Sequence, residues 1–206
     1  MTTTSEGSGA VYAEGFIWVA ISDAIYAKAE AKAAEMGTLN NSIRGGKGNL
    51  VGFIGEEVAN IGLRMLGYKI EENNTFQHDM LLDRVSFEVK TKDRTVAPLL
   101  HYEASVANYN TQQSADCYVF VSVTRDKKTN RYIEGFVIGL MPKDEYIRRA
   151  RFLKKGTVDP SNGWVVSADC HNLPYRALYR FDESDLVSTQ PPCARVDDPD
   201  RKSERS

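Results

Sequence analysis

The segment formed by residues 78–90 constrains the fold of this chain more than any other, because it has the pattern of a short β-hairpin. Two apolar-rich runs flank Asp83-Arg84, which we interpret as a two-residue turn, although arginine is a poor substitute for the glycine that such turns favour. With this turn Leu82 faces Val85, and that pair sets the register of the two strands.

This register predicts one apolar face and one polar face, because successive side chains of a strand point to opposite sides of a sheet. The residues expected on the apolar face are Met80, Leu82, Val85, Phe87 and Val89, and those expected on the polar face are Asp79, Leu81, Ser86, Glu88 and Lys90. Counting outward from the turn places Asp79 opposite Glu88. Directly opposed like charges destabilise a sheet, and a bound divalent cation would remove that repulsion. The alternative is a solvent-facing hairpin whose polar side carries acids without a function.

Asp79, an eight-residue gap and then Glu88-Val89-Lys90 resemble the core motif of the PD-(D/E)xK nuclease superfamily. The preceding residues 52–59 (Gly-Phe-Ile-Gly-Glu-Glu-Val-Ala) resemble the first helix of that superfamily, which often supplies another acid. His78 stands where the motif has proline, which leaves the chemistry intact. The resemblance covers about Asn49 to Val123.

The resemblance implies a restriction-endonuclease-like α/β fold, in which helices flank a central mixed β-sheet that carries a catalytic hairpin. It implies a nuclease that hydrolyses DNA phosphodiester bonds, endonucleolytically, with Mg²⁺ as cofactor and Mn²⁺ as a substitute. The catalytic residues would be Glu56, Asp79, Glu88 and Lys90, and the metal ligands would be Asp79, Glu88 and the backbone carbonyl of Val89. Two carboxylates suit Mg²⁺, which is usually held by only one or two of them. Lys90 would orient the attacking water as a cation or act as a base, and the sequence leaves both roles open.

The helix acid is Glu56 or Glu57. An apolar stripe expected at Leu50, Ile54, Val58, Ile61 and Met65 has Glu57 at its border and Glu56 nearly opposite. The spacing Gly-Glu-x-x-Ala of similar sequences selects Glu56, with Glu57 as the reserve, and two solvated helix acids are the alternative. Without metal, repulsion between the acids of the site should raise the pKa of at least one carboxyl group.

The residues expected to contact DNA are Lys92, Arg44, Lys47 and Gln113. Lys92 shares the strand face of Lys90, Arg44 and Lys47 belong to a glycine-rich loop, and Gln113 ends a helix expected after the hairpin. Homodimerisation is common among similar enzymes that cut both strands, and the sequence leaves it open. A different class of function is also open: a catalytically inactive binding module with the same fold, since one fold hosts many functions.

Composition frames these expectations. The 206 residues predict one domain over residues 11–187, with disordered tails at 1–10 and 188–206. A net charge of −2 gives no global basic field, and the three cysteines argue against a disulfide scaffold. No apolar run is long enough to span a membrane and no signal peptide is visible, so we expect an intracellular, cytoplasmic protein.

Periodicity and turn residues predict the order of the elements. Helices are expected at Val11–Met36, from an N-cap at Asn49 to Leu66, at Glu103–Ser114, and from Pro142 to about Lys155. Strands are expected at Tyr68–Glu72, in the hairpin, at Cys117–Thr124, at Tyr132–Leu140, at Trp164–Ser167 and at Ala177–Phe181.

Overall fold

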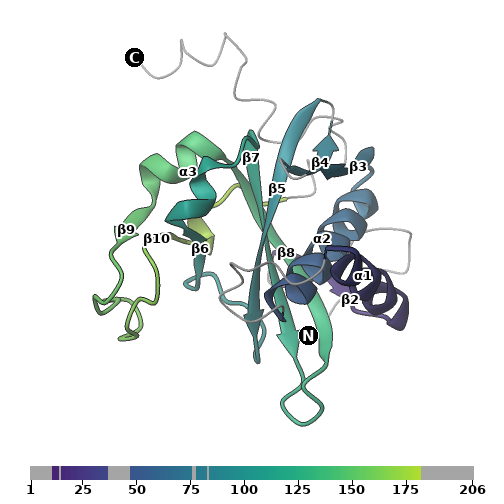
Figure 1. Ribbon diagram of the computed structural model, residues 1–206, viewed down its shortest axis with the longest axis horizontal. Coiled ribbons are helices and arrows are strands. Elements are labelled where there is room, and N and C mark those ends of the chain that lie inside the picture. Colours follow the sequence, from purple (N-terminus) through teal and green to yellow (C-terminus); the bar gives the residue numbers. More distant parts are fainter. Residues whose placement is uncertain (1–10, 14, 37–46, 76–77, 83, 182–206) are drawn as a thin grey trace.

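The computed structural model describes residues 11–13, 15–36, 47–75, 78–82 and 84–181 (Figure 1). These residues form a seven-stranded mixed sheet, a three-stranded antiparallel sheet and three α-helices. The expected α/β class is therefore confirmed. The predicted terminal tails lie outside the described residues.

The large sheet has the strand order β1-β2-β8-β7-β5-β4-β3. Its strands are β1 (Val11–Ala13), β2 (Phe16–Ala20), β3 (Ile70–Thr75), β4 (His78–Leu82), β5 (Val85–Arg94), β7 (Cys117–Arg125) and β8 (Tyr132–Pro142). Strands β5 and β7 pair in parallel, and the other neighbours pair antiparallel. The chain therefore leaves the large sheet after β5 and returns to it at β7.

The connection between β5 and β7 contributes to the small sheet, whose order is β6-β10-β9. Its strands are β6 (Glu103–Ala107), β9 (Arg151–Leu153) and β10 (Cys170–Pro174). Short 3₁₀ helices, Asn108–Gln112 and Tyr175–Ala177, follow β6 and β10. The α-helices are α1 (Asp23–Met36), α2 (Lys47–Met65) and α3 (Lys143–Arg149).

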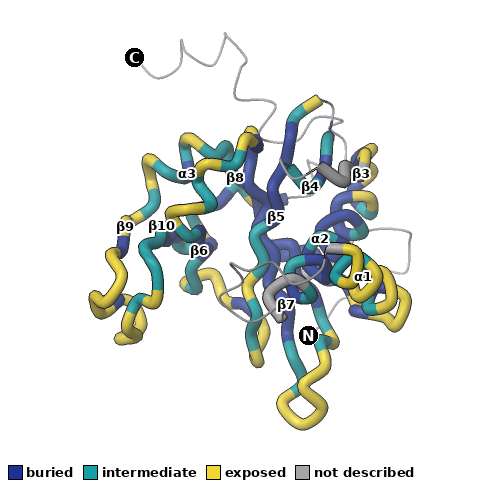
Figure 2. Tube along the Cα trace, in the orientation of Figure 1, coloured by how far each residue is buried: buried dark blue, intermediate teal, exposed yellow. Residues whose placement is uncertain are grey.

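The large sheet separates two hydrophobic cores. Helices α1 and α2 pack on one face, and the small sheet with α3 lies on the other side (Figure 1). The side chains of β7 alternate between the cores: Val119 and Val121 enter the first, and Tyr118 and Phe120 enter the second. The prediction of a buried strand over Cys117–Thr124 is thus confirmed, and Figure 2 shows β7 as largely buried.

The hairpin forms with the expected register, since Leu82 pairs with Val85 and Met80 pairs with Phe87. Arg84 has a φ of 70°, so it adopts the left-handed conformation that a tight hairpin turn requires. Asp83 lies outside the described residues. The predicted apolar face is confirmed as well, because Met80, Leu82, Phe87 and Val89 are buried in the first core and Val85 packs against it.

Two expected helices are wrong in part or in whole. In the Val11–Met36 segment only α1 is helical, and β1 and β2 precede it on either side of Gly15, whose φ is 81°. The Glu103–Ser114 segment forms β6 and a 3₁₀ helix, with Ala104 and Val106 buried at the spacing of a strand. In both segments the apolar residues meet a sheet partner, and tertiary packing overrides helix propensity.

Smaller differences concern element ends. Asn49 does not cap α2, which begins at Lys47, whereas Gly67 follows its C-terminus with a φ of 86° as expected of a terminating glycine. Helix α3 ends at Arg149 and not near Lys155, because the chain there enters β9. The last strand is β10. It lies between the two late strands that were expected at Trp164–Ser167 and Ala177–Phe181, and neither of those two forms a strand.

No helix in the described part of the chain is long and apolar enough to cross a membrane. Cys117 and Cys170 are free thiols, and Cys193 lies outside the described residues.

Candidate active site

Asp79 is held at the point where the pairing of β4 with β5 ends. The last paired residues of this ladder are Met80 and Phe87. Asp79 Oδ2 then accepts a hydrogen bond of 2.7 Å from the backbone N–H of Val89. A side chain replaces the next ladder bond, and this fixes the Asp79 carboxylate against β5, next to Glu88.

This hydrogen bond also shows where the carbonyl of Val89 points. The N–H and C=O groups of one strand residue lie on the same side of the strand, where a paired residue would exchange both bonds. Because the N–H of Val89 points to Asp79, its carbonyl faces the same region, beyond the end of the recorded β4–β5 pairing. The backbone thus presents an oxygen beside the Asp79 carboxylate, as expected for a third metal ligand.

Glu88, Lys90 and Gln113 form a closed triangle of polar contacts. Glu88 Oε1 accepts from Lys90 Nζ at 3.0 Å and from Gln113 Nε2 at 2.6 Å. Gln113 Oε1 accepts from Lys90 Nζ at 2.6 Å. Glu88 is only 7% exposed, so these bonds hold a buried carboxylate in one orientation.

Gln113 therefore takes a different place from the one expected of it. The sequence assigned it to a helix as a DNA contact, but it follows the 3₁₀ helix and contacts Glu88 and Lys90 directly. No local pattern predicts this contact, because it depends on the path of the chain from β5 to β7.

Tyr118 is a further residue of the site that the sequence did not single out. It pairs with Glu88 in the β5–β7 ladder, and Lys90 Nζ lies 5.6 Å from the centre of its ring. Burial raises the pKa of Tyr118 to about 12, and the charge of Glu88 adds to this shift. Tyr118 thus forms an apolar wall under the ammonium group of Lys90.

Helix α2 brings Glu56 to the site through a close contact at Gly55. A Cβ atom added to Gly55 would lie 1.8 Å from Thr91 Oγ1, so only glycine permits this approach of α2 to β5. Burial raises the pKa of Glu56, Lys32 lowers it, and the negative charge of Glu88 raises it further. Glu56 therefore lies within electrostatic reach of the hairpin acids.

Glu57 has a separate role. It is buried and forms ion pairs with Lys28 at 2.9 Å and with Lys32 at 3.0 Å, both on α1. Lys32 also lies 3.5 Å from Glu56. Glu57 thus joins α1 to α2, and Glu56 is the helix acid that faces Asp79 and Glu88.

The expected apolar stripe of α2 needs a correction. Leu50, Ile61 and Met65 are only partly buried, while Ala59 and Leu63, on the side of Glu56, are fully buried. The helix packs against both the sheet and α1, so it buries a wider face than a single stripe predicts.

The expected rise in a carboxyl pKa is confirmed at Asp79. Burial raises the pKa of Asp79 to about 8, and the charges of Glu88 and Glu56 contribute to the increase. The Val89 hydrogen bond and Lys90 act in the opposite direction. In the absence of a cation, burial and the neighbouring acids thus disfavour the ionised form of Asp79.

The donor set fits Mg²⁺ or Mn²⁺ with a small number of protein ligands. Within the described residues, no group of three or more His, Cys, Asp and Glu side chains could hold a metal ion. Mg²⁺ does not need such a cage, since it retains several waters and binds one or two carboxylates. The contacts above engage Asp79 Oδ2 and Glu88 Oε1, so each carboxylate has a second oxygen to offer.

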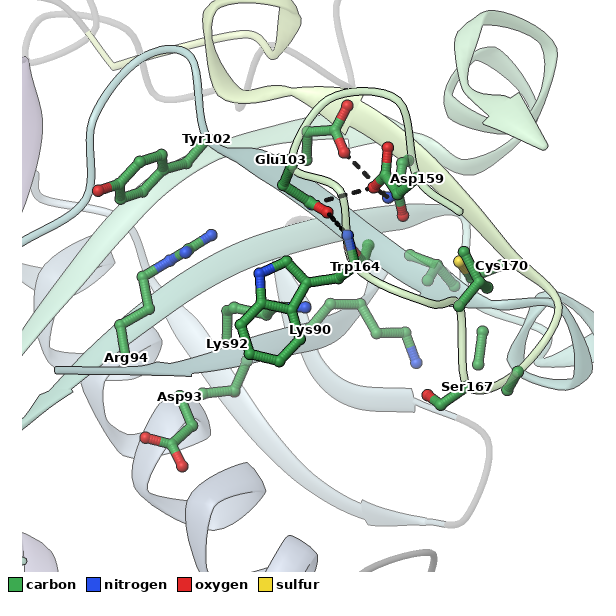
Figure 3. Close-up of a pocket in the computed structure, with 18 of the residues that line it drawn as sticks. Lys90, Lys92, Asp93, Arg94, Tyr102, Glu103, Asp159, Trp164, Ser167 and Cys170 are labelled. Carbon is green, nitrogen blue, oxygen red and sulfur yellow. Dashed lines mark hydrogen bonds between the residues drawn. The ribbon is translucent and has the colours of Figure 1, made fainter. Parts of the chain in front are cut away.

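A cleft of about 1280 Å³ shares Val89 and Lys90 with this site and follows β5 (Figure 3). Lys90, Lys92 and Arg94 line it from β5. Of the other expected DNA contacts, Arg44 lies outside the described residues, and only the backbone of Lys47 is described.

Comparison with known proteins leaves the family open. No protein-family model matches the chain, and no curated protein matches it.

Proposed function

We propose that this protein is a metal-dependent nuclease that hydrolyses DNA phosphodiester bonds, built on a restriction-endonuclease-like fold. The observation that carries the proposal is the Glu88–Lys90–Gln113 triangle beside Asp79, whose Lys90 also lines a cleft together with Lys92 and Arg94. An acidic pair in contact with a fixed lysine suits phosphodiester hydrolysis, which needs charge relief at the phosphate and a positioned water.

The topology supports the assignment of the fold. Helix α2 precedes the antiparallel strands β3, β4 and β5, and β7 lies parallel to β5 in the same sheet. This is the helix, hairpin and parallel strand order that the resemblance implies. The departure is the β5–β7 connection, which contains β6 and a 3₁₀ helix where we expected an α-helix.

Asp79, Glu88 and the Val89 carbonyl would hold the metal ion, which when bound supplies a polarised water and neutralises charge on the phosphate. Lys90 donates to Glu88 and Gln113, and an ammonium group has a third donor left for a water or a phosphate oxygen. These contacts favour Lys90 as a cation that orients the water. Gln113 is a positioning residue, because it touches both Glu88 and Lys90.

The test is cleavage of plasmid and linear DNA with Mg²⁺ or Mn²⁺ by the full chain and three variants. Lys90→Ala and Glu88→Gln should reduce cleavage about 10²- to 10⁴-fold. Glu71→Gln, which changes an exposed acid on the same sheet, should cut normally. Normal cleavage by the Lys90 and Glu88 variants would show that the site is elsewhere. Absence of cleavage of every DNA and RNA form with both metals would refute the proposal.

A second candidate is a binding module with this fold and no catalysis. It is favoured by one observation: the net charge of −2 gives the chain no global basic field. Calorimetric titration with Mn²⁺ separates the two candidates. The nuclease requires a binding site that is lost in Asp79→Asn and Glu88→Gln, whereas the module requires none.

A further inference from the structure

The cleft is larger than an ordinary small-molecule site, and its lining mixes polar with apolar surface. Its volume of about 1280 Å³ exceeds the roughly 300–1,000 Å³ of typical ligand pockets, which are mostly apolar. Here charged and polar side chains from β5, β6 and the loop of residues 157–168 form much of the lining. A groove of this kind suits a segment of a polymer.

One wall carries a regular row of cations. Lys90, Lys92 and Arg94 occupy alternate positions of β5, so their Cα atoms are about 6.6–6.8 Å apart along the strand. Arg94 is fixed by stacking on Tyr102, with its guanidinium carbon 4.4 Å from the ring centre. A row of fixed cations follows a polyanion such as a phosphate backbone.

Two exposed aromatic side chains also line the cleft. Trp164 is 77% exposed and Tyr109 is 58% exposed, and both line the cleft. In Figure 3, Trp164 comes from the loop on the side of Asp159, while Lys90 and Lys92 come from β5. Large aromatic faces in a cleft that holds cations offer surfaces on which flat, apolar groups stack.

The loop that presents Trp164 is held rigidly by Asp159, which is only 4% exposed. Asp159 accepts from the backbone N–H of Ser161 at 2.9 Å and from Arg151 at 2.8 Å. The backbone of Trp164 is bonded at both ends: its N–H donates to Asn162 Oδ1, and its carbonyl accepts from the N–H of Asp159. The indole is therefore presented to solvent by a fixed loop.

We propose that the cleft binds an unpaired DNA strand, whose phosphates follow Lys90, Lys92 and Arg94 and whose bases stack on Trp164 and Tyr109. This substrate class rests on the proposed nuclease function: the enzyme would act on single-stranded, overhanging or flapped DNA. A charged groove combined with aromatic stacking is how proteins bind single strands without sequence preference, and duplex bases have no free faces for it. The net charge of −2 agrees with a local groove and with weak binding elsewhere.

The test measures binding apart from cleavage, by fluorescence anisotropy of a labelled 20-nucleotide poly-dT strand and of a 20-base-pair duplex, both in EDTA. The single strand should bind at least tenfold more tightly. Trp164→Ala should weaken that binding roughly 5- to 150-fold, and Trp164→Phe should restore most of it. Lys92→Ala should reduce the slope of log affinity against log salt by about 0.7.

Phe152→Ala is the matched control, because Phe152 is a half-exposed aromatic residue of the small sheet outside the cleft. It should bind like the wild type. Equal or tighter binding of duplex, unchanged binding by Trp164→Ala, or an equal loss in Phe152→Ala would overturn the proposal. Duplex cleavage that depends on Glu88 would support the nuclease function and refute the proposed substrate class. Single-strand binding without any cleavage would support the proposed role of the cleft and refute the nuclease function.

Discussion

Replacing Asp79 with asparagine should stabilise the metal-free protein at neutral and alkaline pH. Asparagine is neutral and has nearly the shape of aspartate, and its side-chain oxygen can still accept the hydrogen bond that Asp79 takes from Val89. The substitution removes a carboxyl group whose ionised form is disfavoured by burial and by the charges of Glu88 and Glu56. The hydrogen bond is thus kept, and the free-energy cost of a buried titratable group is lost.

The size of the effect follows from the pKa of Asp79, which is about 8 in the folded protein against an ordinary value of 3.8. Between these values the folded state keeps a proton that the unfolded state has released. The free energy of unfolding of the wild type in EDTA therefore falls as pH rises, by up to about 1.4 kcal/mol per pH unit. Asp79→Asn lacks this dependence, so its advantage should be near zero at pH 4 and reach a few kcal/mol by pH 8.

Metal should narrow the difference in stability between the two proteins. A cation that binds only the folded site stabilises it by about 2.7 kcal/mol at a hundredfold excess over the dissociation constant. The cation must displace the proton of Asp79, so apparent affinity should rise about tenfold per pH unit up to about pH 8. Asp79→Asn should lose most of this metal-dependent stabilisation.

The assay is urea unfolding of both proteins at pH 5, 6, 7 and 8, each with EDTA and with Mn²⁺. Glu71→Gln serves as the control, since it removes an exposed acid from β3 and should follow the wild type. An equal gain from Mn²⁺ in the wild type and in Asp79→Asn would show that Asp79 is not a ligand. A difference in EDTA that does not grow with pH would refute the electrostatic reasoning.

Two further predictions concern packing. Gly55→Ala should destabilise the protein by about 1–3 kcal/mol, because the added Cβ would lie 1.8 Å from Thr91 Oγ1. Gly52→Ala on the same helix meets nothing within 4 Å and should stabilise the protein by up to about 1 kcal/mol. Thermal unfolding checks both variants, and equal effects would contradict the close approach of α2 to β5. Tyr146→Phe should cost about 1–3 kcal/mol, because the buried hydroxyl contacts two backbone carbonyls of the small sheet. An unchanged melting temperature would show that those carbonyls find other partners.

The hairpin could be predicted from the sequence because its signals are local. The apolar alternation of Met80, Leu82, Phe87 and Val89 and the two-residue turn act over a few positions, and the structure has that register. The acids of the hairpin follow from the same count. Short-range patterns of this kind survive tertiary packing because the core requires them.

The segment Glu103–Ser114 could not be predicted in the same way. Its residues alternate in burial at Ala104 and Val106, but the polar run that follows also suits a helix face. Its partner is β10, more than sixty residues later in the chain. A strand that depends on so distant a partner leaves little trace in its own sequence.

The contact of Gln113 with Glu88 and Lys90 was beyond the sequence for a related reason. It depends on how the chain leaves β6, turns through a 3₁₀ helix and enters β7. Trp164 is a similar case, since its place in the cleft depends on the buried Asp159 and on the pairing of Val158 with Val165. Both positions are fixed by long connections, whose paths local patterns do not encode.

The separation of the two cores by one sheet has a consequence for how this protein can change over evolution. The helix acid comes from the α1–α2 side, whereas Tyr109 and Trp164 belong to segments that follow strands β6 and β9 of the small sheet on the other side. Insertions or deletions in the loop around Trp164 would alter the width of the cleft without moving Asp79 or Glu88. Proteins that share this fold can therefore change the ligand that the cleft binds while they keep the same hairpin.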